Sequence, residues 1–114
     1  MPDTRIALRE PGDDIVANCL VWIPRNKVCE FALIQRTLVD GEWCHVARID
    51  TARGTVHRHQ YDSATGRDLW NHRLLEKIPV VDGWEVVDRW YIEALELLHN
   101  DWEENLRRWN RDGK

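Results

Sequence analysis

Residues 47–59 hold the side chains best suited to chemistry near neutral pH. This segment contains two histidines, three arginines and one aspartate around a single glycine, Gly54. Imidazole groups titrate near pH 6.5, so histidine can both give and take protons under physiological conditions. Guanidinium groups bind phosphate through paired N–H donors. We therefore expect a site for catalysis or metal binding in this segment.

The spacing of these residues predicts which of them lie together. Alternate side chains of a strand share a face, so His57 and His59 project together while Arg58 faces the other way. A four-residue loop before this strand would set Arg48 opposite His57 and bring Asp50 onto the same face. The expected catalytic residues are therefore Arg48, Asp50, His57 and His59.

A second register is compatible with the sequence. A shift by one residue would bring His45 and Ala47 opposite the histidines instead. The first register is preferred because it gathers apolar side chains on the core face, namely those of Trp43, Ala47, Ile49 and Val56. Three further basic residues are candidates for binding a substrate phosphate: Arg53, Arg58 and His45.

Two chemistries suit this set of side chains. In the first, one histidine removes a proton from an RNA 2′-hydroxyl and the other protonates the leaving oxygen, while Arg48 or Arg58 stabilises charge on the phosphate. That chemistry needs no cofactor. In the second, His57 and His59 bind a divalent metal with Asp50 as third ligand, and positions remain open for water.

The elements that must position these residues are strands joined by short loops. Apolar and β-branched residues predict four strands, at 15–23, 28–38, 43–50 and 55–62. The pair Asp40-Gly41 tolerates positive φ and predicts a tight hairpin between the second and third strands. Short loops between consecutive strands indicate an antiparallel meander.

A long amphipathic helix is expected at residues 82–110, where Asp82 and Glu85 form a capping pattern. Its core-facing residues recur at helical spacing: Trp84, Val87, Tyr91, Ala94, Leu95, Leu98, Trp102, Leu106 and Trp109. The fold class is α+β, with a meander of about four strands packed by this helix. Residues 69–81 show no clear period, and residues 1–14 are expected to be loosely ordered.

A second apolar stripe occupies the opposite side of that helix. It comprises Val86, Trp90 and Leu97, which are candidate partner-binding residues. Three kinds of cover are open: another protein, a second copy of the chain in a homodimer, or residues 69–81 folding back over the helix.

Composition limits the classes of protein. The chain has 114 residues and a net charge of −4, which is enough for one domain and argues against a surface devoted to nucleic acid. The charge is uneven, however: residues 48–73 hold five arginines and three aspartates, whereas residues 82–112 hold nine acids and four arginines. The molecule should have a basic part and an acidic part.

The cysteines and the apolar segments indicate the cellular compartment of the protein. Cys19, Cys29 and Cys44 form an odd set without a Cys-x-x-Cys spacing, which is typical of reduced, mostly buried thiols rather than of disulfides or a zinc–thiolate site. No apolar run reaches the roughly 18 residues of a membrane span, and the first 14 residues have no signal-like apolar core. We expect a cytoplasmic protein that does not enter a membrane.

Several of these features occur together, in the same order, in the TumE-like toxins of prokaryotic toxin–antitoxin systems, which the chain resembles. The matching residues are Val21-Trp22-Ile23-Pro24, Asp40-Gly41, Arg48-Ile49-Asp50, Gly54, His57-Arg58-His59 and the stretch from Leu97-Leu98 to Trp109. The chain is also similar to uncharacterised archaeal, actinobacterial and phage proteins with an Arg-x-Asp-Thr-Ala-x-Gly-x-x-His-Arg signature.

The chain departs from the toxin pattern at two points. The toxins usually show Arg-Tyr-Asp-Asn before the turn, where this chain has Arg48-Ile49-Asp50-Thr51, and the segment after His59 is longer here. The resemblance implies a toxin-like role against RNA and a cognate antitoxin. Together with the histidine chemistry above, it makes a ribonuclease-type toxin the favoured hypothesis. The alternative is a non-enzymatic binding module, such as a phage-encoded inhibitor or an accessory protein.

Overall fold

A six-stranded antiparallel sheet and two helices make up the fold in the computed structural model, which describes residues 4–10, 12–22, 27–52, 54–71 and 73–110. The strands follow one another as neighbours from β1 to β6. Their bounds are β1 Thr4–Glu10, β2 Asp13–Trp22, β3 Lys27–Val39, β4 Glu42–Ala52, β5 Thr55–Gln60 and β6 Arg73–Lys77. The expected α+β meander is confirmed, with more strands than the four predicted.

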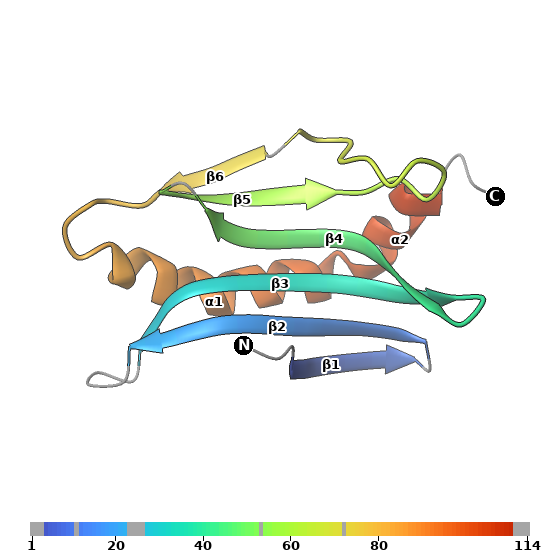
Figure 1. Ribbon diagram of the computed structural model, residues 1–114, viewed down its shortest axis with the longest axis horizontal. Helices are drawn as coiled ribbons and strands as arrows, with labels where there is room; N and C mark the ends of the chain where they lie inside the picture. Colours follow the sequence, from blue (N-terminus) through green and yellow to red (C-terminus); the bar gives the residue numbers. More distant parts are fainter. Residues whose placement is uncertain (1–3, 11, 23–26, 53, 72, 111–114) are drawn as a thin grey trace.

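Both additional strands lie at the edges of the sheet (Figure 1). Strand β1 pairs with β2, so the expectation that residues 1–14 are loosely ordered is wrong for residues 4–10 and 13–14, while residues 1–3 and 11 lie outside the described residues. Strand β6 pairs with β5 and arises from the segment 69–81, whose pattern had favoured no element. Pairing with a formed neighbour supplies the hydrogen bonds that such short segments cannot form alone.

The Asp40-Gly41 hairpin is confirmed. Both residues have positive φ, at 51° and 81°, and Val39 pairs with Glu42 across them. This combination suits the right-handed twist of the two flanking strands. The proline that was expected to end the first strand, Pro24, lies outside the described residues.

The C-terminal helix is divided into α1, Gly83–Asn100, and α2, Trp102–Asn110. The prediction of one helix over 82–110 is therefore wrong at Asp101. Helix α1 lies mainly on β3, whereas α2 lies on β4 and β5, so the break lets the helical segment follow the twisted sheet (Figure 1). Asp82 lies at the N-terminus of α1 with a left-handed backbone. Its side chain makes no capping hydrogen bond, so the predicted capping pattern is wrong.

The core lies between the sheet and the two helices. Of the predicted core positions, Val87, Ala94, Leu98 and Trp102 are buried, with Trp102 only 1% exposed. Trp109 is half-buried against this core, whereas Trp84 is half-buried outside it. The opposite face of the sheet carries no helix of the described chain (Figure 1). Because Ile49 and Arg58 face the helices, their strand neighbours Asp50, His57 and His59 lie on this opposite face.

Candidate functional site

The pairing of β4 with β5 brings the four expected catalytic residues onto the face that the helices leave uncovered. Arg48 pairs with His59 and Asp50 pairs with His57. The predicted pairing of Arg48 with His57 is therefore wrong by two residues, because β4 continues until Ala52 pairs with Thr55. A shift by two preserves the alternation of side chains, so the predicted grouping on one face holds.

Asp50 lies at the centre of this group. It is 6% exposed, and its Oδ2 accepts a hydrogen bond of 2.5 Å from Arg48 Nε. The same oxygen is 3.5 Å from His59 Nε2. Burial by itself raises the pKa of the Asp50 carboxyl, but His59 and Arg48 outweigh burial, so the pKa lies below its ordinary value. The carboxylate is therefore ionised at neutral pH.

His59 lies between two carboxylates. Its Nδ1 is 2.8 Å from Oδ2 of Asp68, and its Nε2 faces Asp50. The ring is 6% exposed and stacks on Tyr61, with 6.0 Å between centroids and 2° between planes. Burial alone lowers the pKa of His59, but the two carboxylates outweigh it and raise the pKa above its ordinary value. The contacts with Asp68, Asp50 and Tyr61 hold the imidazole in one orientation.

His57 is the more accessible histidine. It is half-buried, and its ring centroid lies 5.6 Å from that of His59. Its Nδ1 is 2.7 Å from the hydroxyl oxygen of Thr55, two residues earlier on β5. One ligand atom each from Asp50, His57 and His59 can be chosen so that all three lie within 4.8 Å of one another.

Asp68 belongs to this site although the sequence interpretation did not include it. Its Oδ1 accepts hydrogen bonds from the backbone N–H groups of Gln60 and Trp70, at 3.1 and 3.0 Å, while Oδ2 contacts His59. Residue 68 returns to β5 through an isolated bridge with Tyr61. No periodicity in the sequence links Asp68 to the histidines. The turn predicted at Gly66 was the only sequence signal that the chain reverses here.

Arg58 is separated from the histidines by the sheet, as the alternation predicts. Its guanidinium is 8% exposed and donates to Asn105 at 2.9 Å and to Asp101 at 3.2 Å, both on the helical side. Burial lowers the pKa of Arg58, while Asp101 opposes this effect. Arg58 therefore connects the sheet to the C-terminal helical segment and does not lie beside Asp50. Arg53 lies outside the described residues.

His45 lies at the end of a row of rings. It is exposed, and its centroid is 6.2 Å from Tyr61, which in turn stacks on His59. His45 and Tyr61 also line a hollow of about 320 Å³ that reaches Trp109. His45 is not opposite the histidines, as the second register would require, because Ala47 already pairs with Gln60 at the end of β5.

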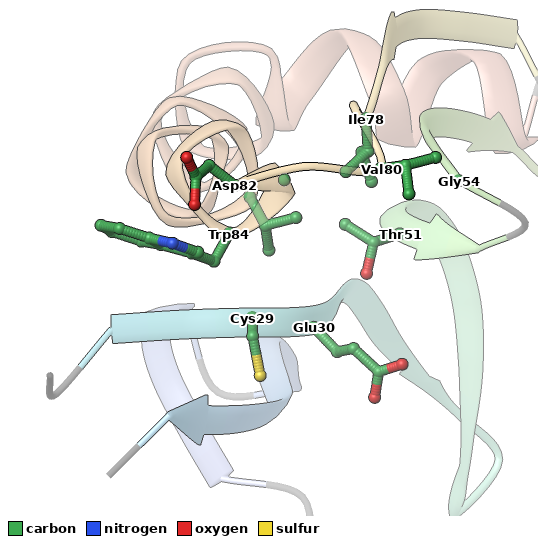
Figure 2. Close-up of a pocket in the computed structure, with 10 residues that line it drawn as sticks. Cys29, Glu30, Thr51, Gly54, Ile78, Val80, Asp82 and Trp84 are labelled. Carbon is green, nitrogen blue, oxygen red and sulfur yellow. The ribbon is translucent and has the colours of Figure 1, made fainter. Parts of the chain in front are cut away.

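A larger hollow of about 390 Å³ opens at the far end of β4, where α1 begins (Figure 2). Its lining includes Cys29, Thr51, Gly54, Asp82 and Trp84. Figure 2 shows that it lies between β3, the turn after β4 and the segment that leads into α1. All three cysteines are half-buried, and none of them forms a disulfide.

The second apolar stripe of the helix is partly covered. Trp90 is half-buried against the core, and its Nε1 donates a 2.8 Å hydrogen bond to Glu76 on β6. Residues 69–81 therefore supply some of the cover, which was one of the three alternatives. Trp90 and Leu97 still line a hollow of about 310 Å³ together with Glu93, Glu96 and Asn100. Val86 is half-buried.

The chain belongs to the family DUF7718, a domain of unknown function, whose model matches residues 19–111. No curated protein matches the chain. No solved structure matches it either. Within the described ranges, neither helix combines the length and the apolar character that crossing a membrane requires.

Proposed function

We propose that this protein is a toxin-type enzyme that cleaves RNA at the centre formed by Arg48, Asp50, His57 and His59. The observation that carries the proposal is the convergence of these four polar side chains on a sheet face without helices. Ionisable groups buried together at the cost of desolvation are typical of functional sites. The order of motifs shared with the TumE-like toxins adds support.

The proposed reaction is attack of the RNA 2′-hydroxyl on the adjacent phosphorus. The hydroxyl loses its proton, the P–O5′ bond breaks and the leaving oxygen gains a proton, which gives a 2′,3′-cyclic phosphate and a 5′-hydroxyl. Arg48 suits the role of phosphate ligand because its side chain is 34% exposed at the rim of the centre. His57 is the group of the centre that a bound phosphodiester would meet first, since His59 is buried.

A basic and aromatic cluster at one edge of the sheet supports RNA as the substrate. The guanidinium carbons of Arg58, Arg73 and Arg108 lie 5.1, 3.8 and 5.1 Å from the centroid of Trp70. Arginine beside an exposed or half-exposed aromatic ring is a common means of holding unpaired nucleotides and their phosphates. Trp70 follows Asp68 by two residues, but because the cluster includes Arg58 it lies on the helical side of the sheet, opposite the face that holds His57 and His59.

The hollow on α1 supports a protein partner. Two of its lining residues are apolar, Trp90 and Leu97, and two are acidic, Glu93 and Glu96. A basic amphipathic segment of a cognate antitoxin would complement this surface. The same hollow favours the second candidate function, a binding module without enzymatic activity that acts through protein contacts.

Growth arrest on induced expression tests the proposal, together with incubation of the purified protein with RNA. We expect His57→Ala to lower the cleavage rate by about 100-fold or more while circular dichroism shows a retained fold. His99→Ala is the matched control, because His99 is exposed on α1. Cleavage by His57→Ala at the wild-type rate would contradict the proposal, and absence of cleavage by the wild type would favour the binding module.

A further inference from the structure

We infer that Asp50, His57 and His59 form a binding site for one divalent first-row transition-metal ion. Two imidazoles and one carboxylate are a ligand set that such ions prefer, and their candidate ligand atoms lie within 4.8 Å of one another. The binding of the ion does not depend on the proposed function. Only the reaction that the ion would serve, RNA cleavage, rests on it.

The distances are close to those that a bound ion requires. With bonds of about 2.1 Å, tetrahedral coordination places ligand atoms about 3.4 Å apart. The separation between His59 Nε2 and Asp50 Oδ2 is 3.5 Å. The widest separation in the set does not exceed 4.8 Å, so small rotations of the half-buried His57 ring can close the remaining gap.

Both imidazoles are oriented by groups outside the ligand set. Asp68 lies 2.8 Å from Nδ1 of His59, and the Thr55 hydroxyl lies 2.7 Å from Nδ1 of His57. Coordination through Nε2 of each ring keeps both of these contacts. A carboxylate behind a histidine that binds metal is the usual supporting arrangement, since it fixes the tautomer and makes the other nitrogen a better donor.

Asp50 supplies an independent indication of a ligand. Its Oδ1 is buried and accepts no hydrogen bond from the part of the chain that the structure describes. Asp50 as a whole is 6% exposed. A buried carboxylate oxygen without a donor is costly, and an ion bound through both oxygens of Asp50 removes that cost.

The local charge also favours a cation. With His59 neutral, as coordination through its Nε2 requires, Asp50 and Asp68 bring two negative charges to the centre and Arg48 brings one positive charge. A phosphodiester is an anion and would be repelled by the excess carboxylate. A divalent ion reverses the sign of the site, and three protein ligands leave coordination positions open to water or substrate oxygen.

The ligand set distinguishes between kinds of ion. Imidazole nitrogen suits zinc, cobalt, nickel and iron, whereas magnesium and calcium prefer oxygen ligands. The site should therefore bind Zn²⁺ and Co²⁺ in preference to Mg²⁺ and Ca²⁺. Cobalt is a convenient probe, because its visible absorption reports nitrogen ligands and a low coordination number.

The test is titration of the chelator-treated full chain with Zn²⁺ by calorimetry and with Co²⁺ by visible absorption. We expect one ion per chain, and an affinity lowered by more than about 100-fold in His57→Ala. This variant alters a half-buried side chain, so it should fold; Asp50→Asn provides a second, nearly isosteric substitution. His99→Ala should bind like the wild type.

Two results would overturn the inference: no stoichiometric binding of Zn²⁺ or Co²⁺ by the folded wild type, or unchanged affinity in both His57→Ala and Asp50→Asn. The measurement uses no RNA, so it separates the two proposals. Zinc binding without RNA cleavage would support the site and contradict the proposed function. RNA cleavage by a folded protein that binds no ion would support the proposed function and contradict the metal site.

Discussion

Asp68 fixes the orientation of His59 through a 2.8 Å contact between Oδ2 and Nδ1. The two residues lie nine positions apart and meet because the chain returns to β5 at the Tyr61–Asp68 bridge. The other oxygen of Asp68 accepts two backbone hydrogen bonds, which hold the carboxylate itself in place. His59 is thus positioned by a group that is anchored independently of the site.

Asp68→Asn should weaken metal binding while leaving the ligand set complete. The amide cannot replace the carboxylate as a charged acceptor for the imidazole N–H, so we expect the affinity for Zn²⁺ to fall by about 10- to 100-fold. Asp62→Asn is the matched control, because Asp62 accepts hydrogen bonds from the backbone N–H and hydroxyl of Thr65 in the nearby turn. Equal affinities of Asp68→Asn and Asp62→Asn, measured by calorimetry, would contradict the prediction.

Stability of the metal-free protein should depend on the protonation of His59. Burial lowers the pKa of His59, but Asp50 on β4 and Asp68 in the loop after β5 outweigh burial and raise it. The rings of His57 and Tyr61 also lie beside His59. A raised folded pKa gives stability that is fully present below the unfolded value, about 6.5, and is lost as the pH rises through the folded pKa.

The difference in urea midpoint between the wild type and His59→Gln measures this effect in chelator-containing buffer. We expect the wild-type advantage to shrink as the pH rises above about 6.5. A difference that stays constant or grows with pH would show that the two carboxylates do not stabilise the imidazolium.

Asn105→Leu should destabilise the protein strongly. The Asn105 side chain is fully buried, accepts from Arg58 at 2.9 Å and donates to Gln35 at 2.9 Å. Leucine would leave a buried guanidinium and a buried amide without these partners, at a cost of about 3 kcal/mol or more in the free energy of unfolding. Asn110→Leu, at an exposed position of α2, should change it by less than about 0.5 kcal/mol. Urea denaturation measures both, and similar values would contradict the prediction.

Trp90 and Arg89 offer a matched comparison, because both donate to the same oxygen of Glu76. Trp90 is half-buried, whereas the Arg89 side chain is 52% exposed. We expect Trp90→Phe to lower the free energy of unfolding by about 1 kcal/mol and Arg89→Ala by less than about 0.5 kcal/mol. Thermal denaturation compares them. A larger effect of Arg89→Ala would mean that the exposed ion pair, rather than the indole, holds β6 to α1.

Hydrophobic periodicity was sufficient for the central strands and for the helical face, because these patterns follow from local geometry. It did not reveal the break at Asp101, where the apolar spacing continues through Leu98 and Trp102 without a proline or glycine. The break follows from the twist of the sheet beneath, to which α1 and α2 adapt separately.

The sequence by itself determined that His57 and His59 share a face with Arg48 and Asp50, because strand alternation survives a register error of two residues. It could not determine that Arg48 pairs with His59, since the length of the connection depends on how far β4 continues. Only the tertiary structure brought in Asp68 and turned Arg58 toward Asn105. Contacts between segments distant in sequence are decided by the packing of the whole chain, and local patterns carry no record of them.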